Sequence, residues 1–258
     1  MKKLEGKVAI VTGGSRGIGK STALAFARAG AAVTVAARTE VENPRMPGTI
    51  HGTVEEIQNS GGRALAVKVD LTKDEDITNM IQRTIEEFGK VDIMVNNAGV
   101  VYRVLPWEFP IKRWDIIMNV DLRGTFLCCQ AVLPYMMKQN SGSIINVSSV
   151  AAQTREIPVG IAYAAAKAGV ERLTWELAED FKGEGYNISI NAIRPHYTAS
   201  EGALLVAGQD YDTSTWQRPE MWAGFCVFLA TRNADELSGR LLLEHEIRWE
   251  AYKAGWVL

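Results

Sequence analysis

"VTGGSRGIGK" at residues 11–20 places four glycines between an apolar run and an alanine-rich one. Glycine weakens both strands and helices, so a cluster of glycines at this junction needs a reason. One reason is a flexible turn. The other is a loop whose main chain comes close to a bound group, because glycine has no β-carbon to keep that group away. The choice between the two depends on what precedes and follows the loop.

The rest of the chain alternates short β-branched runs with longer helical patterns. Several of the runs are apolar at nearly every position, which is typical of parallel strands covered by helices on both faces. Helical periodicity lies between them, for example over 73–88 and 162–181. The expected strands are 7–13, 31–38, 64–70, 90–99, 142–149, 188–195 and 239–246. This alternation predicts an α/β protein with a Rossmann-type, doubly wound, seven-stranded parallel sheet and helices on both faces.

Length and composition narrow the classes of protein that fit. No repeat or linker divides the 258 residues, of which 47% are hydrophobic, so we expect a single domain over residues 1–258. A net charge of −2 provides no overall field for nucleic acid or an anionic membrane. We expect no apolar run long enough to span a bilayer, and the N-terminus has no signal-peptide pattern. Three cysteines without metal-ligand spacing predict buried free thiols, no metal site and a cytoplasmic location.

Two connections are longer than a tight turn requires. The segment 39–52 is expected to be an ordered surface excursion. The segment 196–219 carries several aromatic residues and follows the end of a predicted strand. Long connections in compact domains are usually functional, and ligands of doubly wound sheets bind beyond the carboxyl ends of the strands. We therefore expect 196–219 to be a substrate loop over the site.

The glycine-rich stretch follows the first predicted strand and begins the first predicted helix. A helix N-terminus presents unpaired N–H groups and partial positive charge, and glycines let a diphosphate approach them. The spacing, Gly13-x-x-x-Gly17-x-Gly19, differs from the G-x-G-x-x-G dinucleotide fingerprint. Its position in the first βα unit nevertheless indicates a binding site for the diphosphate of a dinucleotide.

The end of the second predicted strand indicates which dinucleotide is bound. NAD-binding sheets usually have an acidic residue there for the ribose 2′-hydroxyl. This chain instead has Ala36, Ala37 and Arg38. Arg38 and Arg16 could both reach a 2′-phosphate, although each alone could be an ordinary surface charge. The two arginines and the missing carboxylate together favour NADP(H) over NAD(H).

The stretch "YAAAK" places Tyr163 and Lys167 on one helical face. A neighbouring ammonium stabilises phenolate and so lowers the pKa of the phenol. This pattern is common by chance, but two further polar groups lie nearby in the predicted fold. Ser148 and Ser149 end the preceding strand, and Asn119 interrupts an apolar helical run, where a capping or kinking role is the alternative. A phenol, an ammonium, a hydroxyl and an amide on adjacent elements predict a carbonyl-reduction site.

In these motifs the chain closely resembles the short-chain dehydrogenase/reductase family, in its single-domain branch. The matching motifs are "TGGSRGIG", Asp70, "NNAG" at 96–99, Asn119, "SS" at 148–149 and "YAAAK". The resemblance implies that Tyr163 exchanges a proton with the substrate oxygen and that Ser149 holds this oxygen. It also implies that Lys167 lowers the pKa of Tyr163 and binds the nicotinamide ribose, while Asn119 anchors a water.

The same resemblance implies the residues that contact the cofactor. Asp70 and Leu71 would contact the adenine, and residues 97–99 would line its pocket. The full implied set is Gly13, Ser15, Arg16, Gly17, Ile18, Gly19, Arg38, Asp70, Leu71, Asn97, Ala98, Gly99, Tyr163, Lys167, Pro195 and Thr198.

The chain departs from the family pattern at several positions. Family members commonly have Pro-Gly where this chain has Pro195-His196, which leaves the roles of Thr198 and Ser200 open. His196 is either a residue of the substrate pocket or a harmless substitution. The spacing from Ser149 to Tyr163 is one residue longer than usual, so Ser148 is an alternative to Ser149 as the oxygen-binding serine.

The C-terminal stretch "EHEIRWEAYKAGWVL" replaces the usual family ending. Its Trp249, Tyr252 and Trp256 predict a subunit contact in a homo-oligomer, either a tetramer or a dimer. His51 and His245 have no partners at ligand spacing and are interpreted as structural. Aromatic and aliphatic residues near the expected mouth of the site suggest a bulky apolar substrate.

The sequence therefore predicts an NADP(H)-dependent oxidoreductase that interconverts a ketone or aldehyde with an alcohol by hydride transfer. One alternative is an NAD(H)-dependent alcohol dehydrogenase of the same fold. The other is a dinucleotide-binding sensor without turnover. A sensor has no need of an activated phenol, so the intact set of Ser149, Tyr163, Lys167 and Asn119 argues against it.

Overall fold

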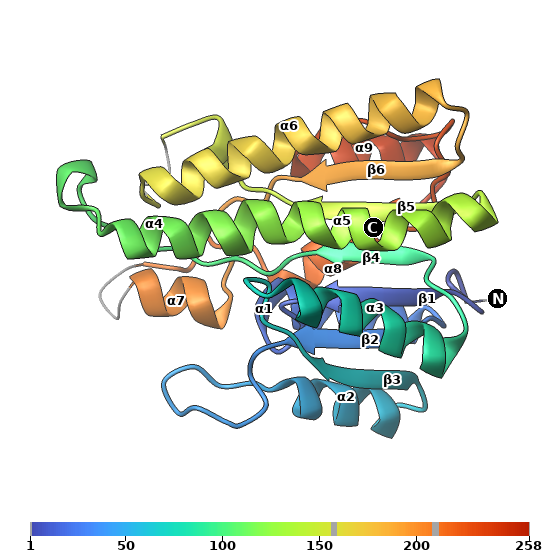
Figure 1. Ribbon diagram of the computed structural model, residues 1–258, viewed down its shortest axis with the longest axis horizontal. Helices are drawn as coiled ribbons and strands as arrows, with labels where there is room; N and C mark the ends of the chain where they lie inside the picture. The colour runs from blue at the N-terminus through green and yellow to red at the C-terminus, as the bar shows by residue number, and fades with distance from the viewer. Residues whose placement is uncertain (1, 156–158, 208–211, 258) are drawn as a thin grey trace.

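The computed structural model describes residues 2–155, 159–207 and 212–257 (Figure 1). Its seven strands form one parallel sheet in the order β3-β2-β1-β4-β5-β6-β7, with the switch in direction between β1 and β4. The strands are β1 (Val8–Thr12), β2 (Ala32–Ala37), β3 (Arg63–Lys68), β4 (Ile93–Asn96), β5 (Gly142–Val147), β6 (Ile188–Ile193) and β7 (Leu241–Leu242). The prediction of a doubly wound, seven-stranded parallel sheet is confirmed.

Helices join the strands and cover both faces of the sheet. They are α1 (Gly17–Arg28), α2 (Ile50–Asn59), α3 (Asp74–Phe88), α4 (Ile111–Ile117), α5 (Gly124–Gln139), α6 (Ile161–Gly183), α7 (Glu201–Ala207), α8 (Pro219–Leu229) and α9 (Glu244–Lys253). Short 3₁₀ turns are η1 (Pro106–Glu108) and η3 (Val150–Ala152), and η2 (Met118–Arg123) is a π-helical turn between α4 and α5. All strand arrows in Figure 1 point toward the edge where α4 and α7 lie.

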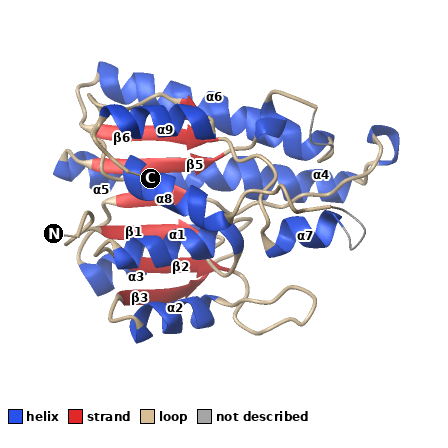
Figure 2. Cartoon of the chain, turned by 180° about the vertical axis from the view of Figure 1, so that it is seen from behind, coloured by secondary structure: helices blue, strands red, loops and turns tan. Residues whose placement is uncertain are grey.

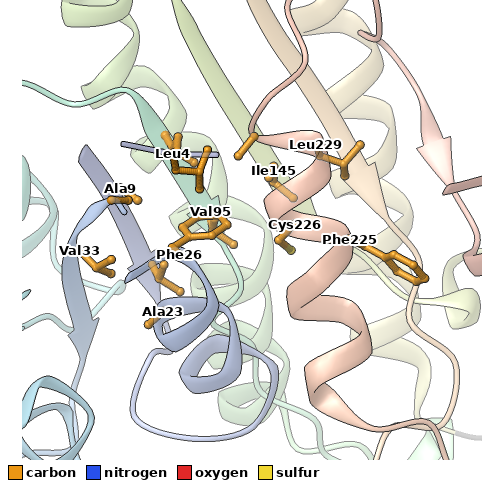
Figure 3. Packing of buried hydrophobic residues seen from close by; sticks show 14 of the residues in the cluster. Leu4, Ala9, Ala23, Phe26, Val33, Val95, Ile145, Phe225, Cys226 and Leu229 are labelled. Atoms are coloured by element: carbon orange, nitrogen blue, oxygen red, sulfur yellow. The ribbon is translucent and has the colours of Figure 1, made fainter. Parts of the chain in front are cut away.

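Alternating side chains of the strands build two apolar cores. In β1, Ala9 and Val11 enter the core beneath α1, α2, α8 and α9, whereas Ile10 enters the core beneath α3, α5 and α6 (Figures 1 and 2). Phe26 of α1 and Phe225 of α8 are buried in the first core (Figure 3). Each side chain of this size stabilises the fold by roughly 1.5–3 kcal/mol when fully buried. The carboxyl edge of the sheet is thus held by packing on both faces.

The prediction of the last strand is largely wrong. Only Leu241–Leu242 of the expected 239–246 pairs with the sheet, and α9 begins at Glu244. The carboxylate of Glu246 accepts a hydrogen bond from the Leu243 N–H at 2.7 Å, which satisfies one unpaired donor at the start of the helix. Glu244 and Glu246 also place negative charge at the positive end of the helix dipole. These local interactions outweigh the β-propensity of the leucine run.

The two long connections are both ordered in the part of the chain that is described. Thr49 caps α2 by accepting a hydrogen bond from Gly52 N at 2.9 Å, so only the end of 39–52, from Ile50 onward, is helical. The segment 196–219 contains α7, and its ends are joined where Ala199 N donates to Gln217 O at 2.9 Å. This closure holds the segment at the carboxyl edge of the sheet, as expected of a loop over the site.

One continuous helical run, Ile111–Gln139, contradicts the expectation that no segment has the length and composition of a membrane span. The run consists of α4, η2 and α5, and its mean hydropathy is 1.3. Half of the apolar window is buried inside the fold. Cys128, Val132 and Met136 of α5 belong to the core between this run and the sheet. We interpret the run as a core helix, which explains its apolar composition.

The C-terminal aromatic residues divide into two groups. Trp256 packs edge-on against Phe228 at 5.4 Å and is partly buried against the chain's own core, and its part in a subunit contact stays a prediction. Trp249 and Tyr252 stack on each other at 5.8 Å and remain 59% and 72% exposed. An exposed aromatic pair of this kind is typical of an interaction surface.

We expect the double variant Trp249→Ser and Tyr252→Ser to shift the protein toward a smaller oligomer. The pair exposes two large rings that association would remove from water. Light scattering across a range of protein concentrations measures the mass, with Val41→Ser as a control because Val41 is 80% exposed elsewhere. An unchanged mass in the double variant would contradict the assignment of α9 to a subunit contact.

Candidate active site

The glycine-rich loop is so tightly packed that side chains would not fit at its key positions. Gly13 and Gly17 adopt positive φ angles of 65° and 55°. A β-carbon on Gly13 would lie 2.9 Å from the Ala98 Cα, and one on Gly17 would lie 2.9 Å from the Ser200 Cβ. A β-carbon on Gly19 would lie only 2.3 Å from the Gly13 carbonyl oxygen. Gly19 therefore lets the first turn of α1 pack against the loop.

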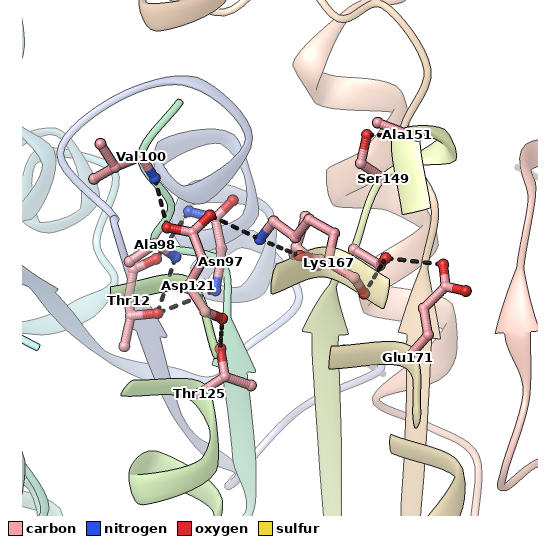
Figure 4. A network of polar contacts seen from close by, with 12 residues as sticks. Thr12, Asn97, Ala98, Val100, Asp121, Thr125, Ser149, Ala151, Lys167 and Glu171 are labelled. Atoms are coloured by element: carbon pink, nitrogen blue, oxygen red, sulfur yellow. Dashed lines mark hydrogen bonds and ion pairs between the residues drawn. The ribbon is translucent and has the colours of Figure 1, made fainter. Parts of the chain in front are cut away.

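The ends of β1 and β4 are joined beside this loop. The Thr12 hydroxyl accepts hydrogen bonds from the backbone N–H groups of Asn97 and Ala98 at 3.0 and 3.1 Å. The Asn97 side chain donates in return to the Thr12 carbonyl at 2.8 Å (Figure 4). These contacts fix the "NNAG" segment against the glycines, at the point where the strand order reverses.

A cavity of about 670 Å³ runs along the carboxyl edge of the sheet from the glycine loop to α6. Its volume lies within the usual range for small-molecule and cofactor sites. Every cofactor-binding residue implied by the resemblance lines it except Gly19, and so do Ser149, Tyr163 and Lys167. Met46 and Arg103 also line the cavity and were not anticipated. The glycine cradle and this cavity fit a dinucleotide.

Arg16 has a different environment from the one expected. Its Nε donates to Pro47 O at 3.0 Å, and one terminal nitrogen donates to the carbonyls of Met46 and Gly48 at 3.1 and 2.8 Å. Arg16 thus fastens the connection between β2 and α2 over the glycine loop. In the sequence, only the unusual length of this connection pointed to the contact, because the partners of Arg16 lie some thirty residues away.

Arg38 stands exposed on the cavity wall at the end of β2. Although burial raises the pKa of the nearby Asp70, hydrogen bonds from Thr72 and the charge of Arg38 lower it more, so the pKa of Asp70 is below its usual value. Glu40, the first carboxylate after β2, forms an ion pair with Lys68 at 2.6 Å and lies near His51 at 3.7 Å. This pairing ties the Glu40 carboxylate to β3.

The N-terminus of α1 already has an anionic partner. The Glu201 carboxylate, from the first turn of α7, accepts a hydrogen bond from Gly17 N at 2.8 Å. Carboxylates and phosphates both favour this end of a helix. The contact shows that the Gly17 N–H is directed outward, where an anionic group can accept its hydrogen bond.

Tyr163, Lys167 and Ser149 meet at the inner wall of the cavity. The Lys167 Nζ lies 5.4 Å from the centre of the Tyr163 ring, and the Ser149 side chain lies close enough to lower the pKa of the phenol. Ser148 instead donates to Glu171 at 2.9 Å, and Arg194 holds Glu171 through two contacts of 2.8 and 2.9 Å. The geometry favours Ser149 over Ser148 as the serine that holds a substrate oxygen.

The pKa of Tyr163 shifts in the opposite direction to the one expected. Burial raises it most and Asp121 raises it further, whereas Lys167 and Ser149 lower it, and the net direction is upward. Lys167 acts as anticipated, but its effect is smaller than that of burial. Tyr163 is therefore a protonated phenol at neutral pH, which is the form that can donate a proton.

Asn119 lies in the π-helical turn η2, where its carbonyl accepts a hydrogen bond from Gly124 N. It does not line the cavity. Two residues further on, the Asp121 carboxylate approaches the Lys167 Nζ to 3.6 Å. This contact was not anticipated, because one more acidic residue in a helical pattern gives no sign of being buried. Its position depends on the π-helical turn.

The segment after β6 forms the wall at the substrate end. His196 lies edge-on to Tyr197 at 5.1 Å, and Tyr197 stacks on Trp216 at 5.1 Å. All three line the cavity, which places His196 in the wall of the pocket. The Thr198 hydroxyl donates to His196 O at 3.0 Å and so holds this turn. Within the described ranges, no group of three or more His, Cys, Asp or Glu residues could hold a metal.

The fold and the cavity define a dinucleotide-binding α/β protein with a phenol, an ammonium and a hydroxyl at one end of its cleft. The sequence profile of the short chain dehydrogenase family matches residues 7–205. The chain belongs to this family, whose members are NAD(P)-dependent oxidoreductases acting on CH–OH groups.

Several relatives resemble the chain over nearly all of its length. The hydroxysteroid dehydrogenase-like protein 2 of Bos taurus is 34% identical over 248 residues, which cover 95% of this chain and 58% of that protein. The chain thus spans little more than half of that relative. A short-chain type dehydrogenase/reductase from Mycobacterium marinum superposes with a TM-score of 0.83 and 31% identity over 93% of this chain and 94% of that one. A structure from Beutenbergia cavernae with bound NADP at low occupancy has a TM-score of 0.82 and 30% identity over 96% and 98%.

Proposed function

We propose that this protein is an NADP(H)-dependent oxidoreductase that interconverts a ketone or aldehyde with an alcohol. The observation that carries the proposal is the meeting of Tyr163, Lys167 and Ser149 at one end of a cavity whose other end is the glycine cradle. When bound, the nicotinamide supplies hydride to the carbonyl carbon in reduction and accepts it in oxidation. A binding protein without turnover would not need this arrangement.

The chain's own residues handle the oxygen and the proton. Ser149 holds the substrate oxygen by a hydrogen bond, and the Tyr163 hydroxyl donates its proton to that oxygen as the alcohol forms. In oxidation the same phenol accepts the proton. Lys167 supplies positive charge beside the phenol, where it stabilises any phenolate that forms. The protonated phenol at neutral pH favours reduction.

The wall of the cavity beyond Tyr163 supports an apolar substrate. Val101, Tyr197 and Trp216 line this end, together with Leu205 and Val206 of α7. Such a lining binds a bulky apolar carbonyl compound through burial of its surface. We also propose a cytoplasmic location, because all three cysteines are free and buried.

Arg38 supports NADP(H) as the cofactor because it is the cation at the end of β2 that faces the cavity. Glu40, the first carboxylate after β2, is paired with Lys68 and does not replace the acidic residue typical of NAD sites. Arg16 contributes by holding the adjoining connection in place. The alternative is an NAD(H)-dependent alcohol dehydrogenase with the same site.

We expect Arg38→Asp to invert the cofactor preference. The change removes a guanidinium and adds a charge that repels a 2′-phosphate. A charge-assisted hydrogen bond contributes about 1.5–3 kcal/mol, so kcat/KM for NADPH should fall by roughly 10- to 150-fold. Steady-state kinetics with NADPH and NADH measure this ratio, and Arg83→Asp on the exposed side of α3 is the charge-matched control. A parent protein that prefers NADH would refute the assignment.

A further inference from the structure

Asp121 is a buried carboxylate that the proposed chemistry does not require. It is fully inaccessible to solvent in η2. One oxygen, Oδ1, accepts a hydrogen bond from Val100 N at 2.8 Å. Within the described residues the other oxygen, Oδ2, has no hydrogen-bond partner, and it faces the Lys167 Nζ at 3.6 Å (Figure 4). A carboxylate buried with so few hydrogen bonds is costly, so a counter-charge is needed to keep it ionised.

Lys167 provides that counter-charge and is itself buried, with only 3% of its side chain exposed. Its Nζ donates to Val147 O at 2.8 Å and has Asp121 as its second close partner. A β-carbon on Gly99 would lie 3.0 Å from Asp121 Oδ2 and 3.5 Å from the Lys167 Nζ. Glycine at this position thus leaves room for the two charged groups to face each other.

The local helix geometry accounts for the inward position of the carboxylate. Asp121 lies in the π-helical turn that interrupts the run from α4 to α5. Its carbonyl accepts a hydrogen bond from the Thr125 hydroxyl at 2.8 Å, one turn further on. Single π-helical turns inside α-helices are frequent at functional sites. Here the turn places Asp121 beneath the loop after β4 and against α6.

We propose that Asp121 is a positioning residue that acts through Lys167 and keeps Tyr163 in its phenol form, which biases the site toward carbonyl reduction. This role rests on the proposed function of the same site. Asp121 partly cancels the charge of Lys167 at the phenol. Proton donation by Tyr163 in reduction is favoured in consequence, and proton acceptance in oxidation requires higher pH.

The electrostatic surroundings of Tyr163 support this role. Lys167 lowers the pKa of Tyr163 and Asp121 raises it. Glu171 of α6 and Arg194 after β6 form a two-contact ion pair, so their charges offset each other. Further charged or titratable groups on elements that pack against this region are exposed: Arg103 after β4, Lys112, Arg113 and Asp115 on α4, Arg123 on η2, which pairs with Asp74, Arg155 after η3, Arg172 on α6, and His196 after β6.

Asp121 also has a purely structural contact, which a suitable variant preserves. Asparagine at this position keeps an oxygen that can accept from Val100 N but carries no charge. Asp121→Asn therefore separates support of the loop from the electrostatic effect on Tyr163. Asp115→Asn, on the exposed side of α4, removes the same charge away from the site and is the matched control.

The test follows the phenol directly, without turnover. Phenolate absorbs in the ultraviolet, and the part of this absorbance that is missing in Tyr163→Phe belongs to Tyr163. Its change with pH, in the protein without cofactor, reports the titration of Tyr163. We expect this titration to move to lower pH by roughly one unit in Asp121→Asn, and not in Asp115→Asn, because a nearby negative charge has been removed. Burial raises the pKa of Asp121 to about 6, so Asp121 is ionised throughout the alkaline range in which Tyr163 titrates, and the absorbance of the two proteins should diverge in that range.

Kinetics provide the second measurement. The rate of alcohol oxidation should rise with pH as phenolate forms, and in Asp121→Asn this rise should occur at lower pH by the same amount. The ratio of the reduction rate to the oxidation rate at neutral pH should therefore fall. A phenol titration that stays in place or moves upward overturns the proposal. Asp121→Ser, which keeps a hydroxyl acceptor, should show the same shift and replaces Asp121→Asn if that variant does not fold. Absence of any turnover in the parent protein would refute the proposed function but would leave the absorbance test intact.

Discussion

Tyr163→Phe is expected to lose about 10²-fold or more in kcat, the scale of general acid–base catalysis, while keeping its affinity for NADPH. The substitution removes only the phenol oxygen and leaves the ring, which lies 5.4 Å from the Lys167 Nζ. The ring remains in place against its neighbours in the small cluster formed with Ala162 and Ala166. The glycine cradle lies at the other end of the cavity, so cofactor binding there does not depend on the hydroxyl.

Fluorescence titration with NADPH and steady-state kinetics across pH measure these two quantities. Tyr102→Phe is the matched control, because Tyr102 packs against Phe109 and does not line the cavity. Lys167→Ala should impair both binding and turnover, since Lys167 is assigned to the ribose as well as to the phenol. Near-normal turnover in Tyr163→Phe would exclude the proposed mechanism.

The pH dependence has a defined sign. Burial and Asp121 raise the pKa of Tyr163 above its ordinary value despite Lys167. Reduction needs the protonated phenol, so its rate should hold through neutral pH and fall as phenolate forms. Oxidation needs a base and should accelerate over the same alkaline range. The reduction rate should therefore fall over the same pH range in which the oxidation rate rises, and both pH dependences should be absent in Tyr163→Phe.

The features that could be predicted from the sequence are motifs whose residues lie close together along the chain. The glycines of the first βα unit and the Tyr163–Lys167 pair are fixed by neighbours within one or two turns. A parallel sheet is likewise indicated by runs that are apolar on both faces. Consequently the sheet, most of the cavity lining and the family could be anticipated.

The features that were missed depend on contacts between distant segments. Arg16 binds carbonyls that lie some thirty residues further along the chain. Asp121 reaches Lys167 only because a π-helical turn places it inward. Trp256 resembles a free terminal aromatic until its contact with Phe228 is known. No local pattern carries these contacts, because each is decided by the packing of elements already formed.

Gly19→Ala is expected to weaken NADPH binding strongly with little change in the rest of the fold. The new β-carbon would lie 2.3 Å from the Gly13 carbonyl oxygen and 2.4 Å from the Asn97 Nδ2. Both distances are far below van der Waals contact, so the loop must shift or Asn97 must leave Thr12. Overpacking of this kind costs about 1–3 kcal/mol. If that cost falls on the binding conformation, the NADPH dissociation constant rises by roughly 5- to 150-fold.

The comparison variant is Gly183→Ala, at the end of α6, where a β-carbon would meet nothing within 4 Å. Alanine favours a helix over glycine by up to about 1 kcal/mol, so this variant should be neutral or slightly stabilising. Fluorescence titration measures NADPH affinity, and thermal unfolding without cofactor measures the stability of each protein. Loss of affinity in Gly19→Ala alone, with the unfolding temperature lowered by a few degrees at most, is the expected result. Unchanged affinity in Gly19→Ala would mean that the close approach of α1 to Gly13 is not what shapes the cofactor site.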